Sequence, residues 1–173
     1  TVNSEEWDGS SWSEGNNINA ARRDGSLGAG GTQTAAIAAG GTGDTDAAEE
    51  YNGTSWTSVT NLPEGRSGMG VAGIQTNCIH FGGPRQNLEY DGTNWTDGGA
   101  YPVVIQNTAQ AGTQTAGWAA GGQSDPAPGV SNIFRDATNH YDGSSWSAGG
   151  TLPAVNFRAG AAGTQTAGLL FGG

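Results

Sequence analysis

The chain has 173 residues, which suffices for one domain with its own core and without disulfides. Glycine is the commonest residue at 32, charged residues make up only 13% and no Gly-x-y period occurs, so the composition excludes a collagen and favours a turn-rich all-β domain. Sixteen acidic against six basic residues give a formal net charge of −10, which argues against nucleic acid or anionic bilayers as partners.

Two further features of the chain limit its class. No apolar run approaches the roughly 20 residues of a membrane-spanning helix, so no membrane insertion is predicted. The sequence starts at Thr1 without Met, which suggests a processed product or a part of a longer protein. Cys78 is the sole cysteine, so no internal disulfide can form, and we expect it to be a small buried hydrophobe.

Three landmarks recur four times along the chain, which indicates a repeat architecture. The first is an aromatic residue, Asp or Asn, Gly, Ser or Thr, any residue and Trp, with copies beginning at Trp7, Tyr51, Tyr90 and Tyr141. The second is GTQT or GIQT, with copies beginning at Gly31, Gly73, Gly112 and Gly163. The third is a glycine pair nine residues later, at Gly40-Gly41, Gly82-Gly83, Gly121-Gly122 and Gly172-Gly173.

Each copy is predicted to form four short strands. In the segment ending at Phe81, Ile79 and Phe81 alternate with Cys78 and His80, which is the period of a strand. The Asp-Gly pair of the first landmark favours a tight hairpin, and its Trp begins the returning strand. A strand of small residues precedes each GTQT, and a polar turn at its Gln-Thr joins that strand to the next one. One unit is therefore expected to be an antiparallel four-stranded sheet.

The unit resembles the kelch repeat, in which a glycine pair ends one strand and Tyr, Trp and Leu-Pro follow. The resemblance covers essentially the whole chain, although Tyr and Trp lie five residues apart here, which shortens the hairpin. It implies an all-β fold, a small β-propeller of four kelch-like blades in a single domain over residues 1–173.

The chain ends predict how such a ring closes. The segment TVNSEEW at the N-terminus has the length of PRQNLEY before the third hairpin, and Glu6 aligns with Glu89. We therefore expect N-terminal strands within Thr1–Ser13 to pair with C-terminal strands within Ala159–Gly173 and complete the last blade. A larger ring that includes a second chain or a longer parent protein is the alternative.

The repeated aromatic and acidic residues are interpreted as structural. The tryptophans Trp12, Trp56, Trp95 and Trp146 occupy one fixed slot in every copy, so a core role is favoured over sugar stacking. The Asp residues adjoin their Gly, whereas the Asp-box of sialidase-type propellers separates Asp and Gly by one residue, so a hairpin role fits them better.

No catalytic or metal motif stands out. The acidic segment Gly43–Glu50 is the only approach to a calcium loop, and a solvated loop is favoured there. Galactose oxidase has kelch-type blades and a copper site, but His80 and Cys78 are a thin basis for a metal centre, and His80 occupies the slot of a packed strand residue. No cofactor, metal or catalytic residue is predicted, while paired carboxylates of a glycosidase remain open.

The variable connections carry the candidate binding residues. In an up-and-down blade, the connections after the second and fourth strands leave on one face, which we call the variable-loop face, and the hairpin turns lie on the other. The longest connection, from Gln123 to His140, exceeds its counterparts by about ten residues. It is either a recognition loop or a tolerated insertion. The candidate ligand-binding residues on this face are Phe134, Arg135, Arg22, Arg23, Arg66, Tyr101, Phe157 and Arg158.

The wording of the repeat, YDGSSW followed by GTQTAGLLFGG, is also similar to kelch-like repeats in structural proteins of bacteriophages, especially those of marine bacteria. This resemblance implies an extracellular virion appendage, such as a tail or fibre component. The leading hypothesis is a non-enzymatic module that binds a host-surface glycan or receptor protein and contacts other virion subunits or its own copies. The alternatives are a carbohydrate-active propeller enzyme and a pure assembly subunit.

Overall fold

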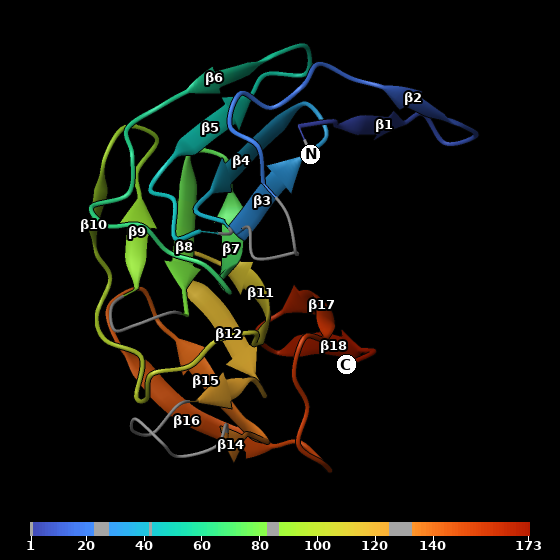
Figure 1. Cartoon of the computed structure of the whole chain (residues 1–173). Helices are drawn as coiled ribbons and strands as arrows, with labels where there is room; N and C mark the ends of the chain where they lie inside the picture. The colour runs from blue at the N-terminus through green and yellow to red at the C-terminus, as the bar shows by residue number, and fades with distance from the viewer. Residues whose placement is uncertain (1, 23–27, 42, 83–86, 125–132) are drawn as a thin grey trace.

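The computed structural model describes residues 2–22, 28–41, 43–82, 87–124 and 133–173, which form strands, turns and loops without any helix. Three four-stranded antiparallel sheets follow one another along the chain, and a two-stranded sheet lies at each end. Figure 1 shows these sheets around an arc that is open on the side where both chain ends lie. The described residues include no helix able to cross a membrane.

The strands have the following bounds. The first complete sheet contains β3 (Gly28–Thr32), β4 (Ala35–Ala39), β5 (Ala48–Tyr51) and β6 (Trp56–Ser58). The second contains β7 (Gly70–Ile74), β8 (Asn77–Phe81), β9 (Leu88–Tyr90) and β10 (Trp95–Asp97). The third contains β11 (Ala109–Thr113), β12 (Ala116–Ala120), β15 (Ala137–Tyr141) and β16 (Trp146–Thr151). A small extra hairpin consists of β13 (Gln123–Ser124) and β14 (Ile133–Phe134). The terminal hairpins are β1 (Glu5–Trp7) with β2 (Trp12–Glu14), and β17 (Gly160–Thr164) with β18 (Ala167–Phe171).

The three complete sheets confirm the predicted antiparallel unit. In the first two sheets consecutive strands pair, and in the third β12 pairs with β15 while β13 and β14 lie in the connection between them. The first strands of successive units lie side by side: β3 packs beside β7, β7 beside β11 and β11 beside β17. The architecture is thus a propeller-like arc of small sheets (Figure 1).

The Asp-Gly hairpins have the geometry that the sequence predicts. Asp91 Oδ1 accepts the backbone N–H groups of Thr93 at 2.8 Å and Asn94 at 2.7 Å, and Gly92 follows with a φ of +90°. Asp142 makes the same turn, and hydrogen bonds from Ser145 and Ser144 lower its pKa to about 2. These side chains therefore stabilise their own turns.

The repeated glutamine of the second landmark links neighbouring sheets. Gln114 Nε2 donates to the carbonyls of Cys78 and Tyr90 in the preceding sheet, at 3.1 Å each. Gln75 and Gln165 make the equivalent pairs of bonds, to Ala36 and Tyr51 and to Gly117 and Tyr141. The sequence pattern suggested only a polar turn, so this inter-sheet role is a finding of the structure.

The repeated tryptophans differ in burial. Trp95 belongs to one hydrophobic core cluster and Trp146 packs against the other, while Trp56 is half-buried. Trp12, by contrast, is 69% exposed, so its predicted core role is wrong for the chain as it stands. Trp95 and Trp146 pack in clusters that include residues of the preceding sheet, Ile37 and Phe81 respectively, whereas among the described residues no sheet precedes the β1–β2 hairpin.

The predicted pairing of the chain ends is not formed in this structure. Among the described residues β1 pairs with β2 and β17 with β18, and these two hairpins remain separate sheets. Each hairpin is bonded to a different end of the arc. Gln33 donates to the Trp7 carbonyl at 3.2 Å, whereas Gln165 joins the C-terminal hairpin to the third sheet.

Candidate functional site

Two connections on the variable-loop face meet and form an exposed patch. One is the β12–β15 connection, whose hairpin carries Phe134 and Arg135, and the other is the β16–β17 connection, which carries Phe157 and Arg158. The rings of Phe134 and Phe157 lie 4.6 Å apart between centroids, tilted by 33°. The Arg158 guanidinium carbon lies 5.9 Å from the centroid of the Phe157 ring. These four residues are called the aromatic–arginine patch below.

Backbone hydrogen bonds hold the two connections together. Asn156 N donates to the Arg135 carbonyl at 3.1 Å, and Arg135 N donates to the Gly122 carbonyl at 2.9 Å. Arg158 N donates to the Asn107 carbonyl at 2.9 Å, and Arg158 has a φ of +60°. A non-glycine residue in this left-handed region is held by its surroundings. The patch is therefore positioned by its backbone.

The patch offers stacking surface and positive charge to solvent. Phe134 is 41% exposed and the neighbouring chain positions Ile133 and Val155 are also exposed, at 39% and 57%. Arg158 is exposed, while Arg135 is partly buried and its Nε donates to Ser124 Oγ at 3.0 Å. Aromatic rings beside guanidinium groups suit stacking on a sugar or aromatic ring and pairing with a carboxylate.

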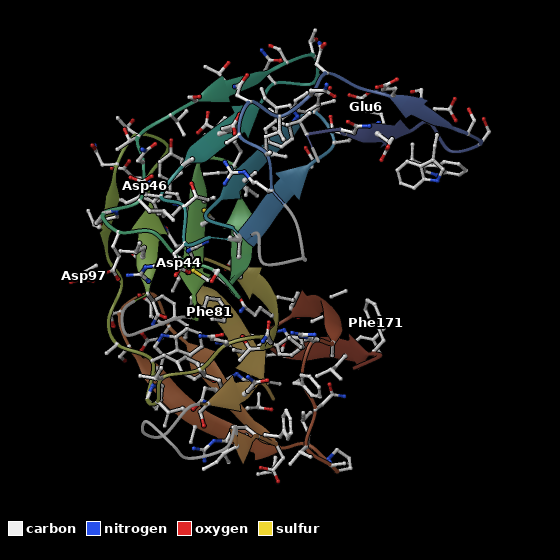
Figure 2. All side chains as sticks on the ribbon, viewed as in Figure 1. Glu6, Asp44, Asp46, Phe81, Asp97 and Phe171 are labelled. Carbon is white, nitrogen blue, oxygen red and sulfur yellow. The ribbon has the colours of Figure 1, made fainter. Side chains whose placement is uncertain are left out.

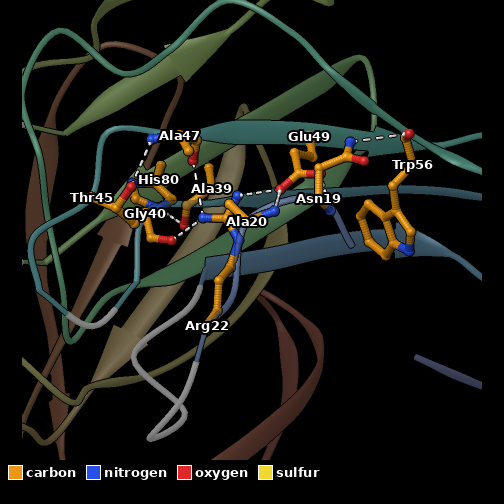
Figure 3. A network of polar contacts seen from close by, with 10 residues as sticks. All are labelled: Asn19, Ala20, Arg22, Ala39, Gly40, Thr45, Ala47, Glu49, Trp56 and His80. Atoms are coloured by element: carbon orange, nitrogen blue, oxygen red, sulfur yellow. Dashed lines mark hydrogen bonds and ion pairs between the residues drawn. The ribbon is translucent and has the colours of Figure 1, made fainter. Parts of the chain in front are cut away.

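Arg22 lies inside the molecule, where it does not suit the predicted surface role. Its Nη2 donates to Glu49 Oε1 at 3.0 Å and its Nη1 to the carbonyls of Gly40 and Ala47. Glu49 also accepts the backbone N–H groups of Asn19 and Ala20, at 2.7 and 2.9 Å. Figure 3 shows this network, which fixes the β2–β3 connection against the first complete sheet.

Two of the remaining candidates are buried and bonded within the molecule. Arg66 is buried and pairs with Glu64 Oε1 at 2.8 Å, and Tyr101 is buried with its hydroxyl accepting from Asn139 Nδ2 at 2.7 Å. Arg23 lies outside the described residues. Of the eight predicted binding residues, the structure thus brings four together, from two connections.

A cavity of about 240 Å³ opens beside Arg66 on the variable-loop side. Its lining consists of Pro63, Glu64, Arg66, Leu88 and Asp97. Two carboxylates therefore face one small space. Sequence reasoning missed this site because Glu64 lies in the β6–β7 connection and Asp97 at the end of β10, and nothing in their spacing relates them.

A wider polar hollow of about 560 Å³ lies beside the β2–β3 connection. Its lining consists of Glu14, Gly15, Asn16, Asn17, Asn19, Ser55 and Trp56. Asn19 Nδ2 donates to the Trp56 carbonyl at 3.2 Å, so part of the polar lining already has partners within the chain. This hollow could not be predicted from the sequence, because its residues come from two distant segments.

The acidic segment Gly43–Glu50, expected to be a solvated loop, is so only in its first part, because Glu49 is buried and residues 48–50 belong to β5. Its carboxylates have separate partners: Asp44 accepts from Ser67 Oγ at 2.6 Å, Glu49 pairs with Arg22, and Glu50 accepts from the Tyr90 hydroxyl at 2.9 Å. No group of three or more His, Cys, Asp or Glu that could hold a metal occurs in the described part of the chain.

His80 and Cys78 are core residues. Cys78 is fully buried, and burial raises the pKa of its thiol to about 12. The buried His80 ring lies edge-on to Trp95, with 5.7 Å between centroids, and its Nε2 lies 3.3 Å from the Ala39 carbonyl. The sequence-based interpretation of both as packed strand residues is confirmed.

His80 makes stability depend on pH. Burial, with the nearby Arg66 charge, lowers its pKa from the ordinary 6.5 to about 3. Below pH 6.5 His80 is protonated in the unfolded chain but stays neutral in the folded chain. The unfolding free energy should therefore fall by about 1.4 kcal/mol per pH unit down to about pH 3. Urea unfolding of His80→Leu at several pH values, with Leu as at Leu170, should show a correspondingly smaller slope. Equal slopes would contradict this assignment.

The comparisons with known proteins concern the fold. No protein-family model matches the chain, and no curated protein matches it. The solved structure of YjhT is similar, with a TM-score of 0.75 and 12% sequence identity. The match covers 94% of this chain and 65% of that one, so this chain spans less than two thirds of its length. The likeness supports the all-β arrangement of small sheets.

Proposed function

We propose that this chain is a non-enzymatic, kelch-like recognition module that binds a glycan or protein through its variable-loop face. The observation that carries the proposal is the aromatic–arginine patch. Its two phenylalanines stack on each other while Phe134 stays 41% exposed, and the exposed Arg158 guanidinium lies over the Phe157 ring in a chain of net charge −10. Exposed aromatic and Arg side chains held by a fixed backbone are the usual centres of binding surfaces.

The setting proposed for this module is a bacteriophage appendage that meets a bacterial surface. This part of the proposal rests on the similarity of the repeat sequence to the repeats of phage structural proteins. The finer architecture belongs to it as well: four kelch-like blades, with the terminal hairpins as the two halves of the fourth. The contacts of the terminal hairpins with opposite ends of the arc support this arrangement.

A glycan array of bacterial surface polysaccharides tests the binding site. The double variant Phe134→Ala, Phe157→Ala should bind its best glycan at least tenfold more weakly, a loss of about 1.4 kcal/mol or more. Ile74→Ala is the matched control, since Ile74 is exposed at the β7–β8 turn on the opposite face. Equal binding by the double variant and the parent would reject the patch as the binding site.

The alternative of a carbohydrate-active enzyme would use the cavity with two carboxylates. Glu64 and Asp97 both line it, and glycoside hydrolysis uses a pair of carboxylates. Release of reducing sugar from the bound polysaccharide, abolished in Glu64→Gln or Asp97→Asn, would favour this reading over the non-enzymatic one.

A further inference from the structure

Arg158 has a backbone conformation that arginine seldom adopts. Its φ of +60° lies in the left-handed region, where the Cβ crowds the following carbonyl oxygen. The residue has a fixed place in the repeat, two positions before the first strand of its unit. The second and third copies have Gly68 and Asn107 at this place, with φ values of +71° and +57°. The left-handed conformation therefore belongs to the repeat, and the arginine to this copy alone among the three.

The backbone of neighbouring units fixes this conformation. Asn107 N donates to the Gly68 carbonyl, and Arg158 N donates to the Asn107 carbonyl, at 2.9 Å each. The three equivalent positions are thus linked from one unit to the next. Gly and Asn tolerate the left-handed region best, so an arginine here costs stability that either of them would spare. The fold does not need the arginine, which points to a function of its side chain.

The guanidinium of Arg158 is available to a ligand. Of the four arginines in the described part of the chain, Arg22 and Arg66 are buried and each pairs with a glutamate, and Arg135 is partly buried. Arg158 is exposed, and no ion pair joins it to any other described residue. It therefore presents a positive charge to solvent in a chain of net charge −10.

The surroundings of this charge are aromatic. The Arg158 guanidinium carbon lies 5.9 Å from the centroid of the Phe157 ring, which stacks on the ring of Phe134. The carboxylates labelled in Figure 2, among them Asp46 and Asp97, lie away from the β16–β17 connection. A ligand at the patch thus meets an apolar ring surface with a guanidinium beside it.

We infer that Arg158 makes the aromatic–arginine patch selective for a polysaccharide that carries carboxylates, such as one with uronic acid units. The C–H face of a sugar ring packs on an aromatic ring, and the carboxylate of the same sugar accepts two parallel hydrogen bonds from a guanidinium. One acidic sugar therefore satisfies both parts of the patch. This inference rests on the binding function proposed above.

The size of the patch favours a glycan over an acidic protein. Four residues form it, whereas a stable protein interface uses about 20–30 residues on each side. The net charge of −10 does not prevent the contact, because exposed charges more than about 8 Å apart are largely screened at physiological salt. The local contact with Arg158 then decides which ligand binds.

An array that carries each acidic bacterial polysaccharide beside its carboxyl-reduced form tests the inference. Reduction turns each carboxylate into an alcohol and leaves the rest of the sugar unchanged. The parent should bind the acidic form of its best ligand about tenfold or more tightly than the reduced form. Arg158→Asn should lose this preference. Asn107→Gly, which changes the equivalent position of the preceding copy, is the matched control and should keep it.

Urea unfolding of the same variants separates specificity from structure. Arg158→Asn should unfold at a urea concentration at least as high as the parent, because Asn relieves the left-handed strain. A midpoint clearly below that of the parent would give Arg158 a structural role and overturn the inference.

The array also distinguishes failure of this inference from failure of the proposed function. Equal binding of the acidic and reduced forms by the parent, with binding lost in Phe134→Ala, Phe157→Ala, overturns the inference alone. A preference for the acidic form that persists in Arg158→Asn does the same, as does tighter binding to polyglutamate, printed to represent an acidic protein. Glycan binding that the double variant retains in full rejects the patch as the site and the inference with it.

Discussion

Trp95→Ala is expected to lower the free energy of unfolding by about 3–5 kcal/mol, the usual cost of truncating a large buried aromatic side chain. Trp95 is 8% exposed and its ring lies 4.6 Å from that of Tyr90. Its Nε1 donates to the Thr60 carbonyl at 2.9 Å, which would lose its donor. The substitution removes packing and a hydrogen bond together.

Urea unfolding followed by circular dichroism measures this difference. Trp12→Ala is the matched control, because the same residue type occupies the same slot of the repeat but is exposed. It should cost less than about 1 kcal/mol. Similar losses in the two variants would show that burial does not distinguish these positions.

Glu49→Ala is expected to cost about 3–5 kcal/mol, because it leaves the buried guanidinium of Arg22 without its carboxylate. Glu49 is fully buried, and it also accepts the backbone N–H groups of Asn19 and Ala20. The β2–β3 connection would lose its main attachment to β5 (Figure 3).

The same unfolding experiment checks this second prediction. Glu14→Ala, which removes an exposed carboxylate from β2, should change the unfolding free energy by no more than about 0.5 kcal/mol. Faster hydrogen exchange at Asn19 and Ala20 in Glu49→Ala should accompany the loss of stability. Unchanged exchange at those amides would contradict the assigned role of Glu49.

The repeat accounts for what the sequence could predict of the fold. Fixed spacing between the Asp-Gly turn, the glutamine turn and the glycine pair limits each copy to short strands, and three copies form the predicted sheets. The recurrence of glycine at the start of the second landmark has a physical reason, which Gly112 illustrates. Gly112 has a φ of +106°, and a Cβ there would lie 2.3 Å from the Ala116 carbonyl oxygen.

Contacts between copies were harder to predict. A hairpin turn alone does not require Gln at a fixed position. Its recurrence in all four copies, at Gln33, Gln75, Gln114 and Gln165, therefore indicated a side-chain contact. Its partners, however, are backbone carbonyls, which carry no sequence information. Trp12 shows that the repeat alone does not predict burial. It occupies the same position of the repeat as Trp95, yet its side chain is exposed.

The candidate binding residues divide for a similar reason. Arg22 and Arg158 both stand in irregular connections, and composition alone cannot tell a guanidinium that turns inward from one that stays in solvent. Glu49, which binds Arg22, lies 27 residues away in the chain. The pairing of Phe134 with Phe157 likewise needed the fold, because it joins two different connections.

A hydrogen-exchange footprint tests most directly whether recognition lies in the residues that differ between the copies. The chain would be compared with and without the polysaccharide that binds it best on the array. The proposal predicts slower exchange in residues 133–136 and 154–158, with the Asp-Gly hairpins unchanged. Protection centred on those hairpins, or on the Trp7 and Trp12 pair, with none at the aromatic–arginine patch, would contradict it.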